Sequence, residues 1–96
     1  MFQVDGYKVE FVHDELLDIE IDGKHPKATA CWISLVSKNH KSDVAYGHAY
    51  CSVEDQYNKN RGRKLSLSRA LKMLTADRNL RKRFWDEYFR VRHGKY

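Results

Sequence analysis

The sequence predicts an α+β fold, in which a four-stranded antiparallel sheet made of two hairpins is followed by two helices packed on one face. Apolar and polar residues alternate with a period of two through the first half of the chain, as in half-exposed strands. In the second half, apolar residues recur three and four positions apart, which is typical of amphipathic helices. The 96 residues, 42% of them apolar, favour a single domain over residues 1–96, with the sheet in 1–53 and the helical pair in 63–93.

The first predicted hairpin joins residues 7–11 to residues 17–22. Tyr, Val and Phe occupy alternate positions in the first segment, while Leu and Ile alternate with acidic residues in the second. Residues 13–15 would form the turn between them, and Asp22-Gly23 marks the next break. The second strand would therefore present an acidic outer face, made of Asp18, Glu20 and Asp22.

The second predicted hairpin joins residues 28–37 to residues 44–53 around the polar loop 39–43. Symmetric closure of this loop would place Cys31 opposite Cys51. One face would be shallow, so that a helix could lie closely on it; it would carry Cys31, Ile33, Leu35, Ala45, Gly47, Ala49 and Cys51. The other face would carry Trp32, Ser34, Val36, Tyr46, His48 and Tyr50.

Two helices are predicted after a polar loop over residues 56–62. Ser66 is the expected N-cap of the first helix, with Leu65 before it as a hydrophobic staple. Thr75 or Asp77 can cap the second helix, which would run to residues 91–93 and end at Gly94. At about 100° per residue, the buried arc of the second helix would consist of Leu80, Phe84, Tyr88 and Val91.

Charge divides the chain near residue 58. Residues 1–58 carry 5 Lys/Arg and 10 Asp/Glu, whereas residues 59–96 carry 13 Lys/Arg and 3 Asp/Glu. Such a concentrated positive field attracts polyanions and accelerates their encounter with the protein. The sequence therefore predicts a binding function in the helical half, with nucleic acid or a nucleic-acid-handling complex as the partner.

The candidate binding residues combine cations with two aromatic rings. Such an arrangement can stack bases and neutralise phosphates, or anchor a protein interface. The alternatives are a solvated basic face and aromatic rings that cover the sheet edge or the first helix. The candidates are Arg61, Arg63, Lys64, Arg69, Lys72, Arg78, Arg81, Lys82, Arg83, Trp85, Phe89 and Arg92.

We expect no enzymatic activity, no metal and no cofactor. The five histidines lack metal-ligand spacing, and neither cysteine has a sequence-local group that would activate it, so both are expected to serve packing. Glu20, Asp22 and Lys24 include the carboxylate-x-Lys pattern of some metal-dependent nucleases, which leaves a small nuclease as an alternative. No stretch is apolar enough for a membrane span and the first residues lack signal-peptide character, so we expect a cytoplasmic protein.

The stretch 51–72 resembles small bacteriophage proteins. In those proteins a strand ends in Cys-Ser, an Asp-x-Tyr/Phe-x-Lys loop follows, and a helix then carries Gly-Arg-Lys-x-x-Leu-x-Arg-Ala-Leu, the pattern found here around residues 62–71. The resemblance covers about a quarter of the chain. It implies a phage or prophage accessory protein, acting in the host cytoplasm without catalysis, of a group that often inhibits host defence or transcription. A protein-only inhibitor or a homodimeric interaction module is the other alternative.

Overall fold

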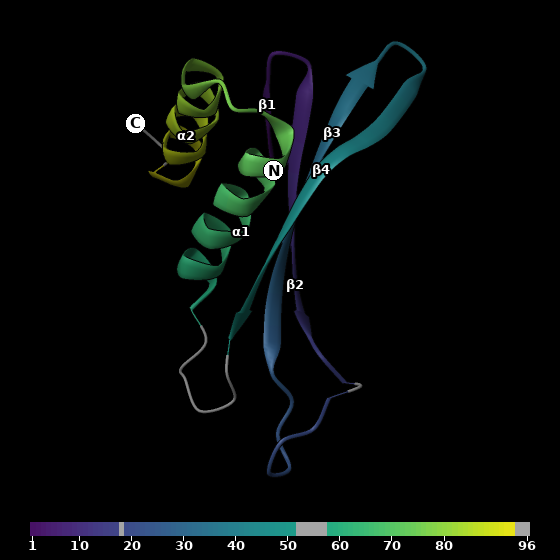
Figure 1. The fold of residues 1–96 in the computed structure, drawn as a ribbon, viewed down its shortest axis with the longest axis vertical. Helices are drawn as coiled ribbons and strands as arrows, with labels where there is room; N and C mark the ends of the chain where they lie inside the picture. The colour runs from purple at the N-terminus through teal and green to yellow at the C-terminus, as the bar shows by residue number, and fades with distance from the viewer. Residues whose placement is uncertain (18, 52–57, 94–96) are drawn as a thin grey trace.

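The computed structural model describes residues 1–17, 19–51 and 58–93. Four strands form one antiparallel sheet in the order β1-β2-β3-β4, and two helices follow them (Figure 1). The predicted α+β fold, with a four-stranded antiparallel sheet and then two helices, is therefore confirmed. The elements are β1 (Phe2–Val4), β2 (Tyr7–Glu15), β3 (Lys27–Ser37), β4 (His40–Cys51), α1 (Lys59–Leu74) and α2 (Arg78–His93).

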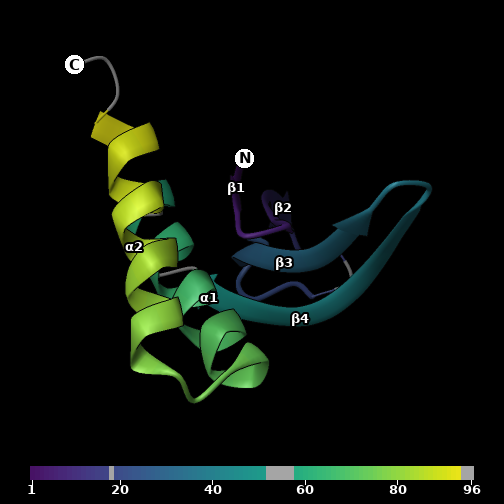
Figure 2. The ribbon, with the colours of Figure 1, turned by 90° about the horizontal axis from the view of Figure 1, so that it is seen from above.

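Both helices contribute to a core on one side of the sheet. Helix α1 contacts β3 and β4, and α2 contacts β1 at the other edge. Viewed from above, α2 is seen along its length and α1 nearly end-on, so the two helices point in different directions beside the strongly curved sheet (Figure 2). Among the described residues, no helix is long and apolar enough to cross a membrane. The core consists of Phe2, Val4, Val9, Cys31, Ile33, Ala45, Leu67, Ala70, Leu71, Phe84 and Tyr88.

Helix α1 lies very close to β4 because the strand has no side chain at Gly47. A Cβ atom placed there would stand 2.2 Å from the Ser66 carbonyl oxygen and 2.5 Å from the Ala70 nitrogen. The neighbouring Ala45 and Ala49 are also buried. The predicted shallow face of small residues, on which a helix lies closely, is thus confirmed.

The first predicted hairpin is wrong. Strand β2 continues through residues 13–15 instead of turning there, and it pairs with β3 from Tyr7↔Leu35 to Glu15↔Lys27. Its hairpin partner is the short β1, joined to it by a turn with positive φ angles at Asp5 and Gly6.

Residues 16–26 therefore connect β2 to β3, and the alternation in residues 17–22 does not form a strand. The described part of this segment contains no strand; it has an isolated bridge between Ile21 and Lys24, with a positive φ at Asp22 and Gly23. Leu17, Ile19 and Ile21 are all exposed. The long β2–β3 ladder supplies backbone hydrogen bonds that a shorter local hairpin could not, and this pairing overrides the local pattern. The expected acidic strand face is thus absent from the described part of this segment; Asp18 lies outside the described residues.

The β3–β4 hairpin exists, but its register differs from the prediction. The loop shortens to Lys38-Asn39, so that Cys31 pairs with Gly47 and not with Cys51. The shift is four residues, and an even shift leaves every side chain on its expected face. Between Ile33 and the hairpin tip a bulge changes the register by one more residue. In this part of the hairpin the faces differ from the prediction: Leu35 is exposed and Ser34 is buried. Burial raises the pKa of the Cys31 thiol to about 12, as expected of a packing cysteine.

Helix α1 begins about two turns earlier than predicted. Its N-cap is Asn58, whose side-chain oxygen accepts a hydrogen bond from the Arg61 nitrogen at 3.1 Å. Ser66 lies inside the helix, buried, and donates to the Arg63 carbonyl. The start of α2 matches the prediction, since Asp77 accepts from the nitrogens of Asn79 and Leu80. The expected loop residues 56 and 57 and the expected stop at Gly94 lie outside the described residues.

Candidate nucleic-acid interface

The candidate cations divide into two groups at opposite ends of the helical pair. Arg61 and Lys64 lie in the first two turns of α1, and Arg92 lies in the last turn of α2. The Lys64 ammonium lies 5.7 Å from the centre of the Phe89 ring, so the first half of α1 lies beside the second half of α2. Arg78 opens α2, about 20 Å along the helix axis from Arg92 at 1.5 Å per residue.

A groove of about 590 Å³ lies between the first half of α1 and the middle of α2. We call it the basic groove; it is lined by Asn58, Asn60, Arg61, Lys64, Leu65, Ser68 and Trp85. None of these residues is acidic. Within the described part of the chain, no carboxylate pairs with Arg61, Lys64 or Arg92. The described lining therefore combines positive charge with neutral hydrogen-bonding groups and an indole ring.

The two candidate aromatic residues form a stacked pair beside this groove. The ring centroids of Trp85 and Phe89 are 5.9 Å apart with an interplanar angle of 27°. Tyr88, buried in the core, meets both rings edge-on. The Lys64 ammonium lies 5.7 Å from the centre of the Phe89 ring, within range of a cation–π interaction. Trp85 is half-buried and Phe89 is 39% exposed, so the pair both covers the core and faces solvent.

Three cations at the start of α2 are already engaged within the protein. Arg83 pairs with Asp5 at 2.6 Å and Lys82 with Asp86 at 2.9 Å. Arg81 donates through Nε to the Thr75 carbonyl at 3.0 Å, which closes the loop between the helices. Exposed pairs of this kind contribute little stability, but they offset the charge available to a partner. Arg78 is exposed in the first turn.

Arg69 and Lys72 are not among the residues that line the basic groove, although Lys72 follows Ser68 by one turn on the same face of α1. The guanidinium of Arg69 donates to the His48 carbonyl at 2.5 Å, at the edge strand β4. This contact ties α1 to the edge strand of the sheet. Lys72 is exposed in the last turn, where its charge favours the helix dipole.

Arg63 is the one candidate whose side chain is buried, being only 9% exposed. Its guanidinium donates to His13 Nε2 at 3.2 Å and to the side-chain oxygen of Asn60. Because His13 Nε2 must then be the acceptor, Nδ1 carries the hydrogen and donates to Thr29 Oγ1 at 2.9 Å. Gly62 makes room for this network, since a Cβ atom there would lie 2.3 Å from Thr29 Oγ1. Arg63 thus ties α1 to the sheet.

Burial and the positive charges of Arg63, Lys59 and Arg92 lower the pKa of His13. In the unfolded chain the pKa of this histidine is near 6.5, so between that value and the lower folded value the unfolded state binds more protons. The contribution of His13 to the free energy of unfolding should be fully present above about pH 6.5 and should be lost as the pH falls below that value. Urea unfolding from pH 8 to pH 5 would measure this decline. His13→Gln should flatten it; an unchanged slope in that variant would contradict the role of His13.

The sheet face opposite the helices carries a row of rings. Trp32 contacts Tyr46, Tyr46 contacts His48, and His48 stacks on Tyr50, with centroid separations of 5.3 to 6.1 Å. The predicted aromatic face is therefore confirmed for these four residues.

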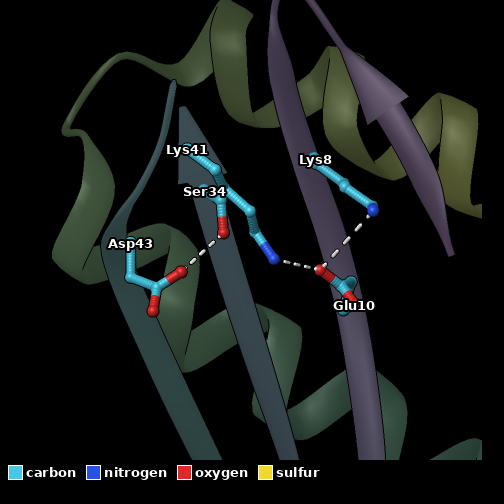
Figure 3. A network of polar contacts seen from close by, with 5 residues as sticks. All are labelled: Lys8, Glu10, Ser34, Lys41 and Asp43. Carbon is cyan, nitrogen blue, oxygen red and sulfur yellow. Dashed lines mark hydrogen bonds and ion pairs between the residues drawn. The ribbon is translucent and has the colours of Figure 1, made fainter. Parts of the chain in front are cut away.

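The charges on this open sheet face compensate one another. Lys41 donates to Glu10 at 2.8 Å, Lys8 lies 3.9 Å from the same carboxylate, and Ser34 donates to Asp43 at 2.7 Å (Figure 3). The hydrogen bond from Lys41 is the main cause of the lowered pKa of Glu10. In contrast to the basic groove, this face presents little net positive charge to a polyanion.

The carboxylates considered for a nuclease lie in the β2–β3 connection. Glu20 and Asp22 are both exposed, and Asp22 adopts a positive φ in the turn with Gly23. Over the described ranges, no group of three or more His, Cys, Asp or Glu side chains is arranged to hold a metal ion.

Four residues of the basic groove were not among the sequence candidates: Asn58, Asn60, Leu65 and Ser68. Asn58 could have been recognised as a cap, because Asn ranks with Ser and Asp at that position. The helix would then have started early enough to place Arg61 and Lys64 one turn apart on one face. Comparison of the chain with family models, curated proteins and solved structures found no match.

Proposed function

We propose that this chain is a non-enzymatic phage accessory protein that binds nucleic acid, or a nucleic-acid-handling host complex, through its basic helical half. The observation that carries the proposal is the basic groove, which Arg61, Lys64 and Trp85 line together and in which none of the described lining residues is acidic. Cations beside an accessible aromatic ring suit a phosphate backbone and its bases. The proposed setting is the host cytoplasm, where binding would interfere with host defence or transcription.

The arrangement of charge around α1 also supports the proposal. The first turn of α1 contains no acidic residue, although acidic residues there would favour the helix dipole. Lys59 and Arg61 occupy that turn instead, so the positive end of the dipole and two cations add together. A bound phosphate would offset this unfavourable arrangement. Phosphate binding would thus explain why cations occupy a turn in which acidic residues are favoured.

Charge reversal in the basic groove tests the proposal. Lys64→Glu should weaken binding of a labelled 20-nucleotide oligonucleotide by about tenfold at low salt, because it replaces a phosphate contact with a repulsion. Lys38→Glu makes the same change in net charge at the exposed tip of the β3–β4 hairpin and should have a much smaller effect. Fluorescence anisotropy gives both dissociation constants. If the two variants lost affinity equally, the interaction would be a nonspecific attraction to the net charge of the protein.

The open sheet face favours a second candidate function, a homodimeric or protein-binding module. Trp32, Tyr46 and Tyr50 are 37%, 45% and 65% exposed, and the charges beside them are compensated. Aromatic rings with compensated charge are typical of protein interfaces. Light scattering at increasing concentration, and capture of host proteins after nuclease treatment, distinguish this candidate. If the protein is a monomer at every concentration, and if all captured partners are lost after nuclease treatment, this second candidate function is excluded.

A further inference from the structure

We infer that the basic groove binds a single-stranded nucleic acid, with one base stacked on the Trp85–Phe89 pair and the phosphates on either side neutralised by Arg61 and Lys64. This inference rests on the proposed function and specifies its ligand. It depends on three features of the described residues: the aromatic pair, the cations beside it, and the open shape of the groove.

The aromatic pair is held in place before any ligand arrives. Tyr88 is 2% exposed and meets Trp85 at 85° and Phe89 at 73°, with centroid distances of 5.8 and 5.3 Å. The two outer rings are therefore fixed from the core side by a buried ring. A preorganised stacking surface loses little conformational entropy when a base binds to it.

The cations are within reach of the same surface. Lys64 already lies 5.7 Å from the Phe89 ring centre, and both Lys64 and Arg61 line the groove with Trp85. A base stacked on the pair would carry its flanking phosphates toward these two side chains. The amide and hydroxyl groups of Asn58, Asn60 and Ser68 complete a lining suited to a polar, aromatic and anionic ligand.

The geometry favours a single strand over a duplex. The groove has a volume of about 590 Å³ and is shallow and open, so a strand can lie along it without being enclosed. In a duplex the faces of the bases are already stacked on one another, so only the backbone could contact the cations. Single strands expose base faces, and stacking on aromatic side chains is the usual way in which proteins hold them.

Tryptophan fluorescence can report on this site directly. The chain has two tryptophans, and Trp32 lies on the open sheet face, so Trp32→Phe leaves Trp85 as the only indole. We would titrate this variant with a 12-mer of deoxythymidine, a 12-mer of uridine and a duplex of the same length, at about 50 mM NaCl. Either single strand should quench Trp85 emission and bind at least about ten times more tightly than the duplex.

Phe89→Ala supplies the decisive variant. It should weaken single-strand binding by roughly 5- to 150-fold, the range expected from losing one base-stacking contact. Tyr50→Ala removes a more exposed ring from the open sheet face and should leave binding unchanged. Circular dichroism and urea unfolding would confirm that both variants fold.

The outcomes separate this inference from the proposed function. Equal affinity for single strand and duplex, with Phe89→Ala binding normally, would overturn the inference and leave binding by the basic half standing. Failure of every oligonucleotide to bind would overturn both. Preference for the single strand that is lost in Phe89→Ala and retained in Tyr50→Ala would support both, whether the strand is DNA or RNA.

Discussion

Gly47→Ala is expected to destabilise the fold by about 3 kcal/mol, because the added methyl group would overlap the backbone of α1. The clash involves the Ser66 carbonyl oxygen at 2.2 Å and the Ala70 nitrogen at 2.5 Å. Neither is the end of a flexible side chain, so relief requires the helix to move away from β4. Urea unfolding followed by circular dichroism would measure the loss.

Gly23→Ala is the matched control for this substitution. Its Cβ would meet nothing within 4 Å, but the residue has a φ of +78°. The expected cost is therefore only about 1 kcal/mol, from backbone strain in the left-handed region. If Gly47→Ala were no more destabilising than Gly23→Ala, the close packing of α1 on the sheet would be refuted.

Phe84→Ala is expected to cost about 3–5 kcal/mol, because the ring is completely buried and its removal leaves a cavity. Phe89→Ala removes the same ring from the same helix, where it is 39% exposed, and should cost about 1 kcal/mol. Thermal or urea unfolding of the two variants gives the comparison.

This pair of variants also validates the binding experiments. If Phe89→Ala remains folded at 25 °C, a loss of binding in that variant reports on the groove and not on unfolding. Equal destabilisation by the two substitutions would instead place Phe89 in the core, and the proposed stacking pair would then be reduced to Trp85.

The buried faces of α2 and of most of β3 and β4 could be predicted, because within a regular helix or strand the side that is buried follows from periodicity. The arc of Phe84 and Tyr88 on α2 is buried as the helical spacing requires. On β3 and β4 the error in register was an even number of residues, so Cys31 and Gly47 remained on the covered face.

The partners of the strands could not be predicted, because pairing depends on contacts distant in sequence. The alternation of Leu17, Ile19 and Ile21 is typical of a strand, yet all three are exposed in the connection between β2 and β3. Strand β1 was missed since three residues carry too little periodicity to stand out.

The sequence predicted several of the residues that form the candidate site, but it did not predict where in the fold they come together. Arg61, Lys64, Trp85 and Phe89 come together only because α1 begins at Lys59 and its first half lies next to Trp85 and Phe89 of α2. Arg63 has the same residue type as its neighbours but points into the protein, toward His13. Sequence cannot distinguish these arginines, because the difference depends on which way the helix faces the sheet.

The salt dependence of binding tests the central claim most directly, because it counts the phosphates that named side chains neutralise. For a single strand, the logarithm of the affinity should fall linearly with the logarithm of salt concentration, by about 0.7 per phosphate contact. Anisotropy titrations with a deoxythymidine 20-mer over several salt concentrations would give this slope. Replacing Arg61 and Lys64 together by Gln should reduce it by about 1.4, whereas replacing the exposed Lys24 and Lys38 by Gln should leave it unchanged. Equal slopes for the two double variants, or an affinity independent of salt, would contradict nucleic-acid binding in the basic groove.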